Sequence, residues 1–362
     1  MKRILLVSYY YKPFKGVGAA RMTYWAENLN LHGYEVEIIT AIPQPDTAES
    51  DVKIHFVPNE RRPFLVADLG MTWKKEIIEF LKRGIIKNVD YTIISGGPFM
   101  HFGLTNYLKK KLKCKVVLDF RDPFASNDRF KDSIVAGKVK KYLENKYISK
   151  ADGIISVNQH ILNRLKFFSN KFYQVIENGF DERFLPTKKN YQPHENIQDI
   201  VYAGKFYDGC DPSALISVLN QKYLDKVIFH YLGDGGKRLE ILEEKILKNY
   251  GLVEYERTMS IIDSCEIGLI LTEGKEFETL TKPFDYMACE KKILIITEGK
   301  KRVGALHELT KDYPNVFWSE NNDIDIDKNL HLALNASQKS FNADKLARKE
   351  GLKKLVSLLN EI

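Results

Sequence analysis

The sequence predicts an α/β protein made of two Rossmann-like domains that face each other across a cleft. Strand-like apolar runs alternate with segments of helical periodicity along nearly the whole chain, as in a doubly wound parallel sheet. A polar stretch interrupts this alternation once, and the alternation then restarts. The length of 362 residues, 44% of them hydrophobic, is ample for two separate cores.

The first half contains six predicted strands, several of them apolar enough to be covered on both faces of a sheet. The predicted strands are residues 2–8, 35–40, 91–95, 115–120, 153–157 and 173–177. Helical spacing predicts helices between them, at residues 19–33, 102–113 and 136–149. Together these segments form the first predicted domain, residues 1–184.

The interruption is the polar stretch PTKKNYQPHENIQ, which predicts an interdomain linker over residues 185–198. A second predicted domain, residues 199–339, has strands at 199–204, 227–233, 266–271 and 292–297, again separated by helical segments. The last segment, residues 340–362, begins with an Asn-Ala-Asp cap sequence and has helical periodicity. We expect this C-terminal helix to pack back on the first domain.

Charge is unevenly distributed along the chain. The net charge is +7, with about +11 on residues 1–180 and about −4 on the remainder. Basic surface attracts nucleic acid, anionic lipid or phosphorylated substrates. No interleaved aromatic and basic motif is present, so nucleic acid is not an expected partner. Four scattered cysteines without a CxxC pair predict buried free thiols, and therefore a cytoplasmic protein.

Ligands of such sheets bind at the carboxyl ends of the strands, where the loops of the first half carry glycines and a histidine. Gly16 and Gly18 follow the first strand and precede a helix, so their backbone amides could bind an anion. A tight turn without a ligand is the alternative, and the third glycine of a dinucleotide fingerprint is missing. His101 ends a Gly-Gly-Pro loop, where contact with substrate and a structural role are equally expected.

Two further polar groups follow strands of the first half. Asp119, Arg121 and Asp122 come at the end of a strongly apolar strand. They contact substrate or acceptor, or they pair with one another, and the sequence leaves both alternatives open. Asn178 lies in an Asn-Gly turn, for which ligand contact and a hinge role are both consistent.

The second domain has its own glycine loops at strand ends. Gly204 and Lys205 directly follow a strand, which is a suitable place for a cation that binds phosphate. Gly233 belongs to the turn YLGDGG, which can approach a base or a phosphate. A plain loop is the alternative for this turn.

The sequence TKPFDYMACEKKILII predicts a short helix that starts next to a buried strand. Thr281 is the predicted N-cap, and Pro283 suits the first turn because its missing N–H is not needed there. The exposed amides of this turn, the helix dipole and the Lys282 ammonium would bind a diphosphate. Asp285 lies one turn along and can accept hydrogen bonds from the two hydroxyls of a ribose. The alternative is a carboxylate that only offsets the dipole.

In this order, the loops resemble those of the GT-B glycosyltransferases. The resemblance is specifically to the retaining "glycosyl transferases group 1" family (family four), in its bacterial members of the surface-polysaccharide type. It extends from Met1 to about residue 340. It rests on the segments SYYYKPFKGVGAARM, GYEVEIIT, VVLDFRDPF, ENGFD, VYAGKFY and TKPFDYMACEKKILI.

This resemblance implies roles for individual residues. The two glycines of the first loop would lie against the donor phosphates, and His101 would lie near the transferred sugar. Lys205 would hold the diphosphate together with Lys282, which stands in for the second basic residue of the family. Asp285 takes the place of the glutamate that holds the ribose, whereas the first glutamate of the family has no secure equivalent.

The resemblance implies a hexosyltransferase. It would transfer a sugar from a nucleotide-diphospho-sugar to a glycan or lipid-linked glycan, with retention and without a cofactor. No metal is expected, since no Asp-x-Asp motif occupies a suitable place. An epimerase of the same fold and a non-catalytic partner subunit are the alternatives.

Two basic stretches bear on the acceptor. Residues 61–87 mix cations with apolar side chains, and residues 107–115 add a run of lysines. They are consistent with peripheral attachment to the anionic inner face of the plasma membrane, which would carry a lipid-linked acceptor. A solvated charged face is the alternative.

Overall fold

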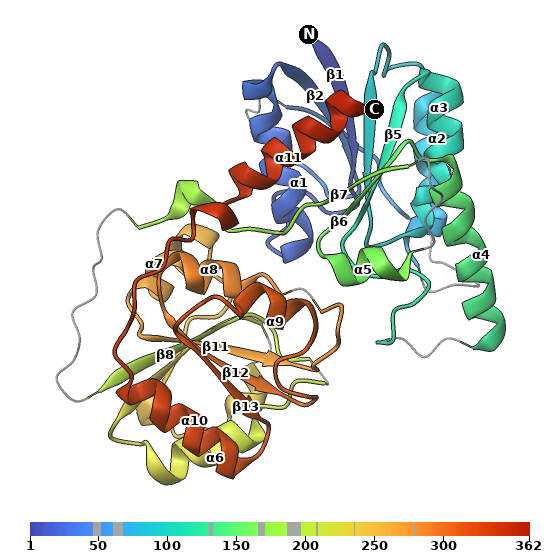
Figure 1. Ribbon diagram of the computed structural model, residues 1–362. Helices are drawn as coiled ribbons and strands as arrows, with labels where there is room; N and C mark the ends of the chain where they lie inside the picture. The colour runs from blue at the N-terminus through green and yellow to red at the C-terminus, as the bar shows by residue number, and fades with distance from the viewer. Residues whose placement is uncertain are drawn as a thin grey trace. The chain divides into compact units, whose positions relative to one another are not determined.

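The computed structural model describes residues 1–45, 52–60, 68–129, 133–165, 171–186, 197–207, 209–234, 236–278 and 280–362. The chain divides into two compact units (Figure 1). The N-terminal unit consists of Met1–Asn178 and Arg348–Ile362, and the C-terminal unit is Gly179–Ala347. Most of the linker expected at 185–198 lies outside the described residues.

The N-terminal unit is built on a parallel sheet with the strand order β3-β2-β1-β4-β5-β6-β7. Its strands are β1 Lys2–Val7, β2 Tyr34–Thr40, β3 Lys53–Phe56, β4 Tyr91–Ser95, β5 Lys115–Phe120, β6 Gly153–Ser156 and β7 Phe172–Val175. Its helices are α1 Val17–Asn28, α2 Gly70–Lys82, α3 Thr105–Leu112, α4 Ile134–Lys150, α5 Gln159–Arg164 and α11 Arg348–Glu361. This is the Rossmann order, as predicted.

Helices cover both faces of this sheet (Figure 1). Side chains of β1, β4 and β5 share one buried cluster with α1 and α11, to which α11 contributes Leu352, Leu355, Leu358 and Leu359. Helices α2, α3 and α4 lie beside one another on the opposite side of the sheet. The C-terminal helix therefore packs on the N-terminal unit, which confirms the expectation from the sequence.

The C-terminal unit has a second parallel sheet, in the order β10-β9-β8-β11-β12-β13. Its strands are β8 Gln198–Ala203, β9 Val227–Leu232, β10 Leu247–Asn249, β11 Ile267–Thr272, β12 Lys292–Thr297 and β13 Val316–Glu320. Its helices are α6 Ser213–Lys222, α7 Tyr255–Asp263, α8 Lys282–Ala288, α9 Gly304–Thr310 and α10 Asp323–Asn335. Helices α6 and α10 pack on one face, and α7, α8 and α9 pack on the other.

The two central strands β8 and β11 diverge in their connections, so the C-terminal unit has its topological switch point between them. All four cysteines are buried and free, as predicted. No helix of the described residues is long and apolar enough to cross a bilayer.

Candidate functional site

The loops predicted to bind a ligand in the second half all leave the carboxyl ends of strands around the switch point. Gly204 follows β8, Gly233 follows β9, and helix α8 starts at Lys282 after the loop that follows β11. In open α/β sheets, the crevice for a ligand opens at this place. The candidate site is therefore built by the C-terminal unit around these three loops.

Gly204 and Gly233 are packed closely against their neighbours in this site. The backbone of Gly204 has φ +143°, a conformation that L side chains rarely adopt. A Cβ atom on Gly204 would lie 2.5 Å from Cε and 2.9 Å from Nζ of Lys282. A Cβ atom on Gly233 would lie 2.2 Å from the carbonyl oxygen of Gly204. Both glycines are required because backbone and a lysine side chain fill the space next to them.

Lys282 carries the cation of the site. Its Nζ lies 4.7 Å from the ring centroid of Tyr202, which is a cation–π contact. Among the residues that the structure describes, this ammonium has no hydrogen-bond or ion-pair partner. Burial lowers the pKa of Lys282 to about 8, against the opposing effects of Cys210, Glu278 and Asp285. An anion bound here would supply the missing partner.

A stack of buried aromatic rings packs beside the glycine loops and forms hydrogen bonds with their backbone. The rings of Tyr202 and Phe206 lie 4.8 Å apart, and those of Phe206 and Tyr231 lie 5.2 Å apart. The Tyr202 hydroxyl donates to the carbonyl oxygen of Lys205 at 3.0 Å, and the Tyr231 hydroxyl donates to that of Asp234 at 2.9 Å. The stack thus fixes the backbone on which the ligand would rest. Sequence reasoning missed these residues, although a tyrosine near the end of both strands was visible.

Asp285 lies on α8, one turn after Lys282. Its Oδ1 accepts a hydrogen bond from the Tyr255 hydroxyl of α7 at 2.5 Å. The Tyr255 oxygen in turn accepts from the backbone N–H of Asp181 at 3.3 Å. This carboxylate is half-buried and is oriented by a neighbouring helix, as a residue that anchors a ligand should be. Tyr255 had no role in the sequence-based prediction.

The start of α8 differs in one detail from the prediction. Thr281 occupies the N-cap position, but its side chain makes no cap hydrogen bond. Pro283 lies in the first turn, as predicted. The helix has only 7 residues, so its dipole is short and the Lys282 ammonium is the main positive charge here. Lys205 adds an exposed second cation on the neighbouring loop.

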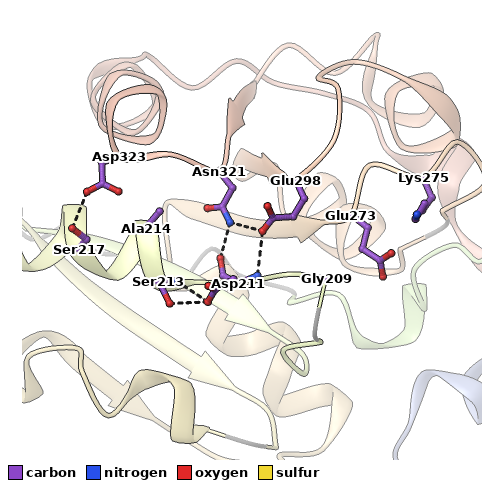
Figure 2. Close-up of a pocket in the computed structure, with 10 residues that line it drawn as sticks. All are labelled: Gly209, Asp211, Ser213, Ala214, Ser217, Glu273, Lys275, Glu298, Asn321 and Asp323. Carbon is purple, nitrogen blue, oxygen red and sulfur yellow. Dashed lines mark hydrogen bonds between the residues drawn. The ribbon is translucent and has the colours of Figure 1, made fainter. Parts of the chain in front are cut away.

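An open pocket with a volume of about 820 Å³ lies farther along the same edge of the sheet (Figure 2). It is lined by Gly209, Asp211, Ser213, Ala214, Ser217, Glu273, Lys275, Glu298, Asn321 and Asp323. The Asn321 amide donates to Glu298 Oε1 at 2.5 Å, and Ser217 Oγ donates to Asp323 at 2.8 Å. Four carboxylates against one lysine make this pocket acidic. It therefore suits hydroxyl groups better than phosphates.

The predicted anion loop of the N-terminal unit is covered by aromatic rings. A Cβ atom on Gly16 would lie 2.2 Å from the Phe14 ring, and one on Gly18 would lie 3.1 Å from the Tyr10 ring. These two rings are stacked, with centroids 4.7 Å apart. The glycines thus make room for packing on this side of the loop.

His101 lies in the core of the N-terminal unit, with none of its surface exposed. Its Nε2–H donates to the Ser95 carbonyl at 2.9 Å, and the Trp73 ring packs edge-on against it at 5.2 Å. Nδ1 has no partner among the described residues. Burial lowers the pKa of His101 to about 3, so the ring is neutral. The geometry matches the structural alternative, and contact with a sugar would require the ring to become accessible.

Asp119 pairs inside the N-terminal unit. It is fully buried, forms an ion pair of 3.2 Å with Arg21 and accepts a hydrogen bond of 3.0 Å from Ser95. This is the internal-pairing alternative, although its partner is Arg21 rather than Arg121. Sequence reasoning missed Arg21 because it lies in the first helix, far from Asp119 in the chain.

The other predicted residues of this unit are partly exposed. Arg121 donates to the Gly18 carbonyl at 2.6 Å, and Asp122 pairs with Arg129 at 3.6 Å. Asn178 is half-buried and is the last residue before the chain enters the C-terminal unit. The structure thus groups Gly204, Lys205, Gly233, Thr281, Lys282 and Asp285 in one unit, whereas Gly16, Gly18, His101, Asp119, Arg121, Asp122 and Asn178 belong to the other.

Within the described ranges, no group of three or more His, Cys, Asp and Glu side chains is placed to hold a metal ion. The expected independence of metals and cofactors stays a prediction.

No family model matches the chain, and no curated protein matches it in sequence. Among solved structures, it is similar to a glycosyltransferase from Rickettsia africae ESF-5, with 15% identity, a TM-score of 0.66 and coverage of 99% of this chain and 96% of that one. It is also similar to the catalytic domain of starch synthase IV from Arabidopsis thaliana bound to ADP and acarbose, with 11% identity, a TM-score of 0.67 and 99% coverage of both chains.

A third similar structure is that of S. aureus MnaA with UDP, with 12% identity, a TM-score of 0.61 and coverage of 100% of this chain and 98% of that one. The likenesses span nearly the whole chain. They show that it has the GT-B fold with two Rossmann-like domains.

Proposed function

We propose that the protein is a glycosyltransferase that uses a nucleotide-diphospho-sugar as donor. The acceptor would be a glycan or lipid-linked glycan, and the transfer would proceed with retention, as part of polysaccharide or glycoconjugate biosynthesis in the cytoplasm. One observation carries the proposal. Lys282, whose ammonium has no ion-pair partner among the described residues, is held against Gly204 at the switch point, with the oriented Asp285 carboxylate one turn away.

The C-terminal unit supplies the groups for the nucleotide. Lys282 and Lys205 would pair with the diphosphate, beside the half-buried backbone of Gly204. Asp285 would accept hydrogen bonds from the ribose hydroxyls. The ADP and UDP in two of the similar structures belong to the same chemical class of ligand.

These residues also suit the chemical step. The acceptor hydroxyl oxygen would replace the diphosphate oxygen on the anomeric carbon, and the hydroxyl proton would pass to the released diphosphate. Negative charge would grow on this diphosphate as its bond to carbon breaks. A fixed ammonium in a partly desolvated place stabilises this charge more than one in water would. Lys282 and Lys205 are therefore the proposed catalytic residues, with His101 predicted near the sugar.

The N-terminal unit would supply the acceptor and sugar contacts. Arg121, Asp122 and Asn178 are partly exposed and stay predicted contacts. The glycines of the first loop stay predicted neighbours of the donor phosphates. Asp119 would act only by holding Arg21 and Ser95 in place.

A direct test is binding of donors to the purified chain. UDP-, GDP-, ADP- and CMP-linked sugars would be screened by thermal shift and then by calorimetry. We expect one nucleotide class to bind, and the Lys282→Met variant to lose that binding while it keeps its unfolding temperature without ligand. If no sugar nucleotide binds, or if Lys282→Met binds it as well as the wild type, the proposal is wrong.

A non-catalytic subunit that binds a nucleotide-sugar is the second candidate. The burial of His101 favours it, because none of the surface of this ring is exposed for contact with a sugar. These two candidates and an epimerase of the same fold differ in turnover. A transferase releases nucleoside diphosphate when acceptor is added, an epimerase converts the donor without acceptor, and a non-catalytic subunit does neither.

A further inference from the structure

Helix α4 has two apolar faces, and only one of them is covered. Tyr147 and Ile148 point into the N-terminal unit and are buried. Ile134, Val135, Val139 and Tyr142 are exposed by 79%, 72%, 44% and 64%. At 3.6 residues per turn, Val135, Val139 and Tyr142 form one stripe on the side opposite the buried residues. A helix on the surface of a globular protein normally turns polar residues to this side.

Lysines flank this apolar stripe on the outer side of α4. Lys138 and Lys146 are exposed, and Lys146 Nζ lies 5.9 Å from the ring centroid of Tyr142. The helix has a single carboxylate, Glu144, and this group is buried. It is paired with Lys141 at 2.8 Å and accepts the backbone N–H of Ala125 at 3.0 Å. The outer side of α4 thus presents apolar groups and cations, and no anion.

The neighbouring helices extend the positive charge. Helices α2 and α3 lie beside α4 (Figure 1), and they expose Lys75, Lys110 and Lys111. The pKa of Lys74 on α2 is lowered by burial and then by the charges of Lys75 and Lys146. This last effect shows that the cations of α2 and α4 act on the same region. Helix α2 also carries Glu76 and Glu79, and Glu79 pairs with Lys82 at 2.7 Å. The charge around the apolar stripe is therefore mainly positive.

We infer that the outer face of α4, defined as Ile134, Val135, Lys138, Val139, Tyr142 and Lys146, docks on the surface of an anionic lipid bilayer. The apolar stripe would enter the boundary between head groups and acyl chains, and the lysines would extend to the phosphates. A tyrosine beside the lysines suits this boundary, because its ring is apolar and its hydroxyl is polar. Binding would need both the apolar and the electrostatic contribution.

Charge argues against a second copy of the chain as the occupant. A two-fold contact through α4 would bring Lys138 and Lys146 of one copy near the same lysines of the other, without an acid to compensate them. An anionic surface is complementary to this face, and a like-charged one is not. The inference does not rest on the proposed sugar transfer, because none of the α4 residues belongs to the nucleotide site.

This face differs from the one expected from the sequence. Residues 61–67 of the predicted membrane stretch lie outside the described residues. Trp73 of the same stretch has none of its surface exposed and donates its Nε1–H to the Val57 carbonyl at 2.8 Å, so it belongs to the core. Trp73 therefore supplies no apolar contact for a membrane in this stretch. The lysines of α3 keep a supporting role.

The test is flotation of the full chain with vesicles of phosphatidylglycerol and with vesicles of phosphatidylcholine, at low and at high salt. We expect binding to phosphatidylglycerol only, weakened by salt. The double variant Val135→Glu/Tyr142→Glu should bind at least about tenfold more weakly. Its matched control is Ile324→Glu/Leu332→Glu on α10, which makes the same change in net charge at two apolar residues that are 84% and 49% exposed in the C-terminal unit; this variant should bind like the wild type.

A second pair of variants isolates the charge. Lys138→Glu/Lys146→Glu should lose binding at low salt, whereas Lys349→Glu/Lys354→Glu on α11 makes the same change in net charge and should keep it. A fluorophore on Val139→Cys should report an apolar environment with phosphatidylglycerol vesicles. The inference is overturned if the wild type binds no vesicle at low salt, or if the α4 variants bind as well as their controls. It is also overturned if the only effect of the α4 variants is to convert a dimer of the chain to a monomer.

Discussion

The two units have the same strand order at their centres, yet their first glycine loops meet different neighbours. In the N-terminal unit, Gly18 follows β1 and packs against the Tyr10 ring. In the C-terminal unit, Gly204 follows β8 and packs against the Lys282 side chain. A glycine at the end of a strand thus marks a place where other atoms pack too closely for a side chain. The identity of these atoms indicates whether the glycine serves packing or ligand binding. Rings from the loop itself favour packing, and a cation from another element favours a ligand site.

The largest expected effect comes from Gly204→Val. The new side chain would meet Lys282 Cε at 2.5 Å and would have to adopt φ +143°. Both effects displace the ammonium, so we expect affinity for the donor nucleotide to fall by about 100-fold or more. Calorimetry with the nucleotide found in the screen measures this. Circular dichroism shows whether the variant is folded, and a folded variant with wild-type affinity would contradict the comparison.

Lys282→Met removes the charge and keeps most of the side-chain volume. A hydrogen-bonded charge typically contributes about 2 kcal/mol, so affinity for a nucleoside diphosphate should fall by about 30-fold. Affinity for the corresponding nucleoside, which has no phosphate, should stay as it is. Equal losses for both ligands would mean that Lys282 acts on the shape of the site and not on the phosphates.

Asp285→Ala should weaken nucleotide binding by about tenfold, or about 1.4 kcal/mol. A dideoxynucleotide, which lacks both ribose hydroxyls, should bind the wild type and Asp285→Ala equally weakly, because the two losses concern the same hydrogen bonds. Tyr255→Phe removes the group that orients this carboxylate and should cause a smaller loss. If the losses of binding free energy from the variant and from the dideoxynucleotide instead add up, Asp285 does not bind the ribose and only offsets the helix dipole of α8.

The lowered pKa of Lys282, about 8, predicts a dependence on pH. Binding of a diphosphate needs the protonated amine. Affinity should therefore be constant below about pH 7 and fall as the pH rises through 8, by at most tenfold per pH unit. Lys282→Arg keeps its charge across this range and should abolish the fall. A calorimetric pH series with both proteins measures it; an unchanged slope in Lys282→Arg would assign the titration to another group.

The smallest effect is expected at the matching glycine of the N-terminal unit. In Gly18→Ala, the new Cβ would lie 3.1 Å from the Tyr10 ring, which can give way by a small shift. We expect a loss of stability of about 1 kcal/mol and a change in nucleotide affinity below about threefold. Thermal unfolding and calorimetry measure the two quantities. A large loss of nucleotide affinity with little loss of stability would instead indicate that the loop containing Gly18 belongs to the donor site.

The central strands were predictable because they are continuously apolar, and their burial on both faces requires such a pattern. The edge strand β3, Lys53–Phe56, escaped prediction because half-exposed residues at a sheet edge carry no such pattern. Strand β13, Val316–Glu320, is similar, since only part of it is buried. Strands of this kind are determined by the neighbour that they pair with and not by their own composition.

The same limit applies to the site. Gly204, Lys282 and Asp285 stand out because strand, loop and helix start follow one another in the sequence. Tyr255, which orients Asp285, comes from another helix and needs the fold to be found. The apolar stripe of α4 escaped prediction for the same reason, because the sequence of a helix with two apolar faces does not show which face is buried. The residue types of a segment are compatible with a ligand site or with a buried core, and only the packing of the folded chain decides between the two.

Helix α11 has a consequence for synthesis on the ribosome. Its leucines, Leu352, Leu355, Leu358 and Leu359, complete the core of the N-terminal unit, although they are translated after the second unit, Gly179–Ala347. A domain usually folds as soon as it has emerged. Here the first domain has to wait, with part of its apolar interior open to water, until the whole second domain has been made. A nascent chain stalled after Ala347 should therefore bind chaperones through the groove that α11 later fills.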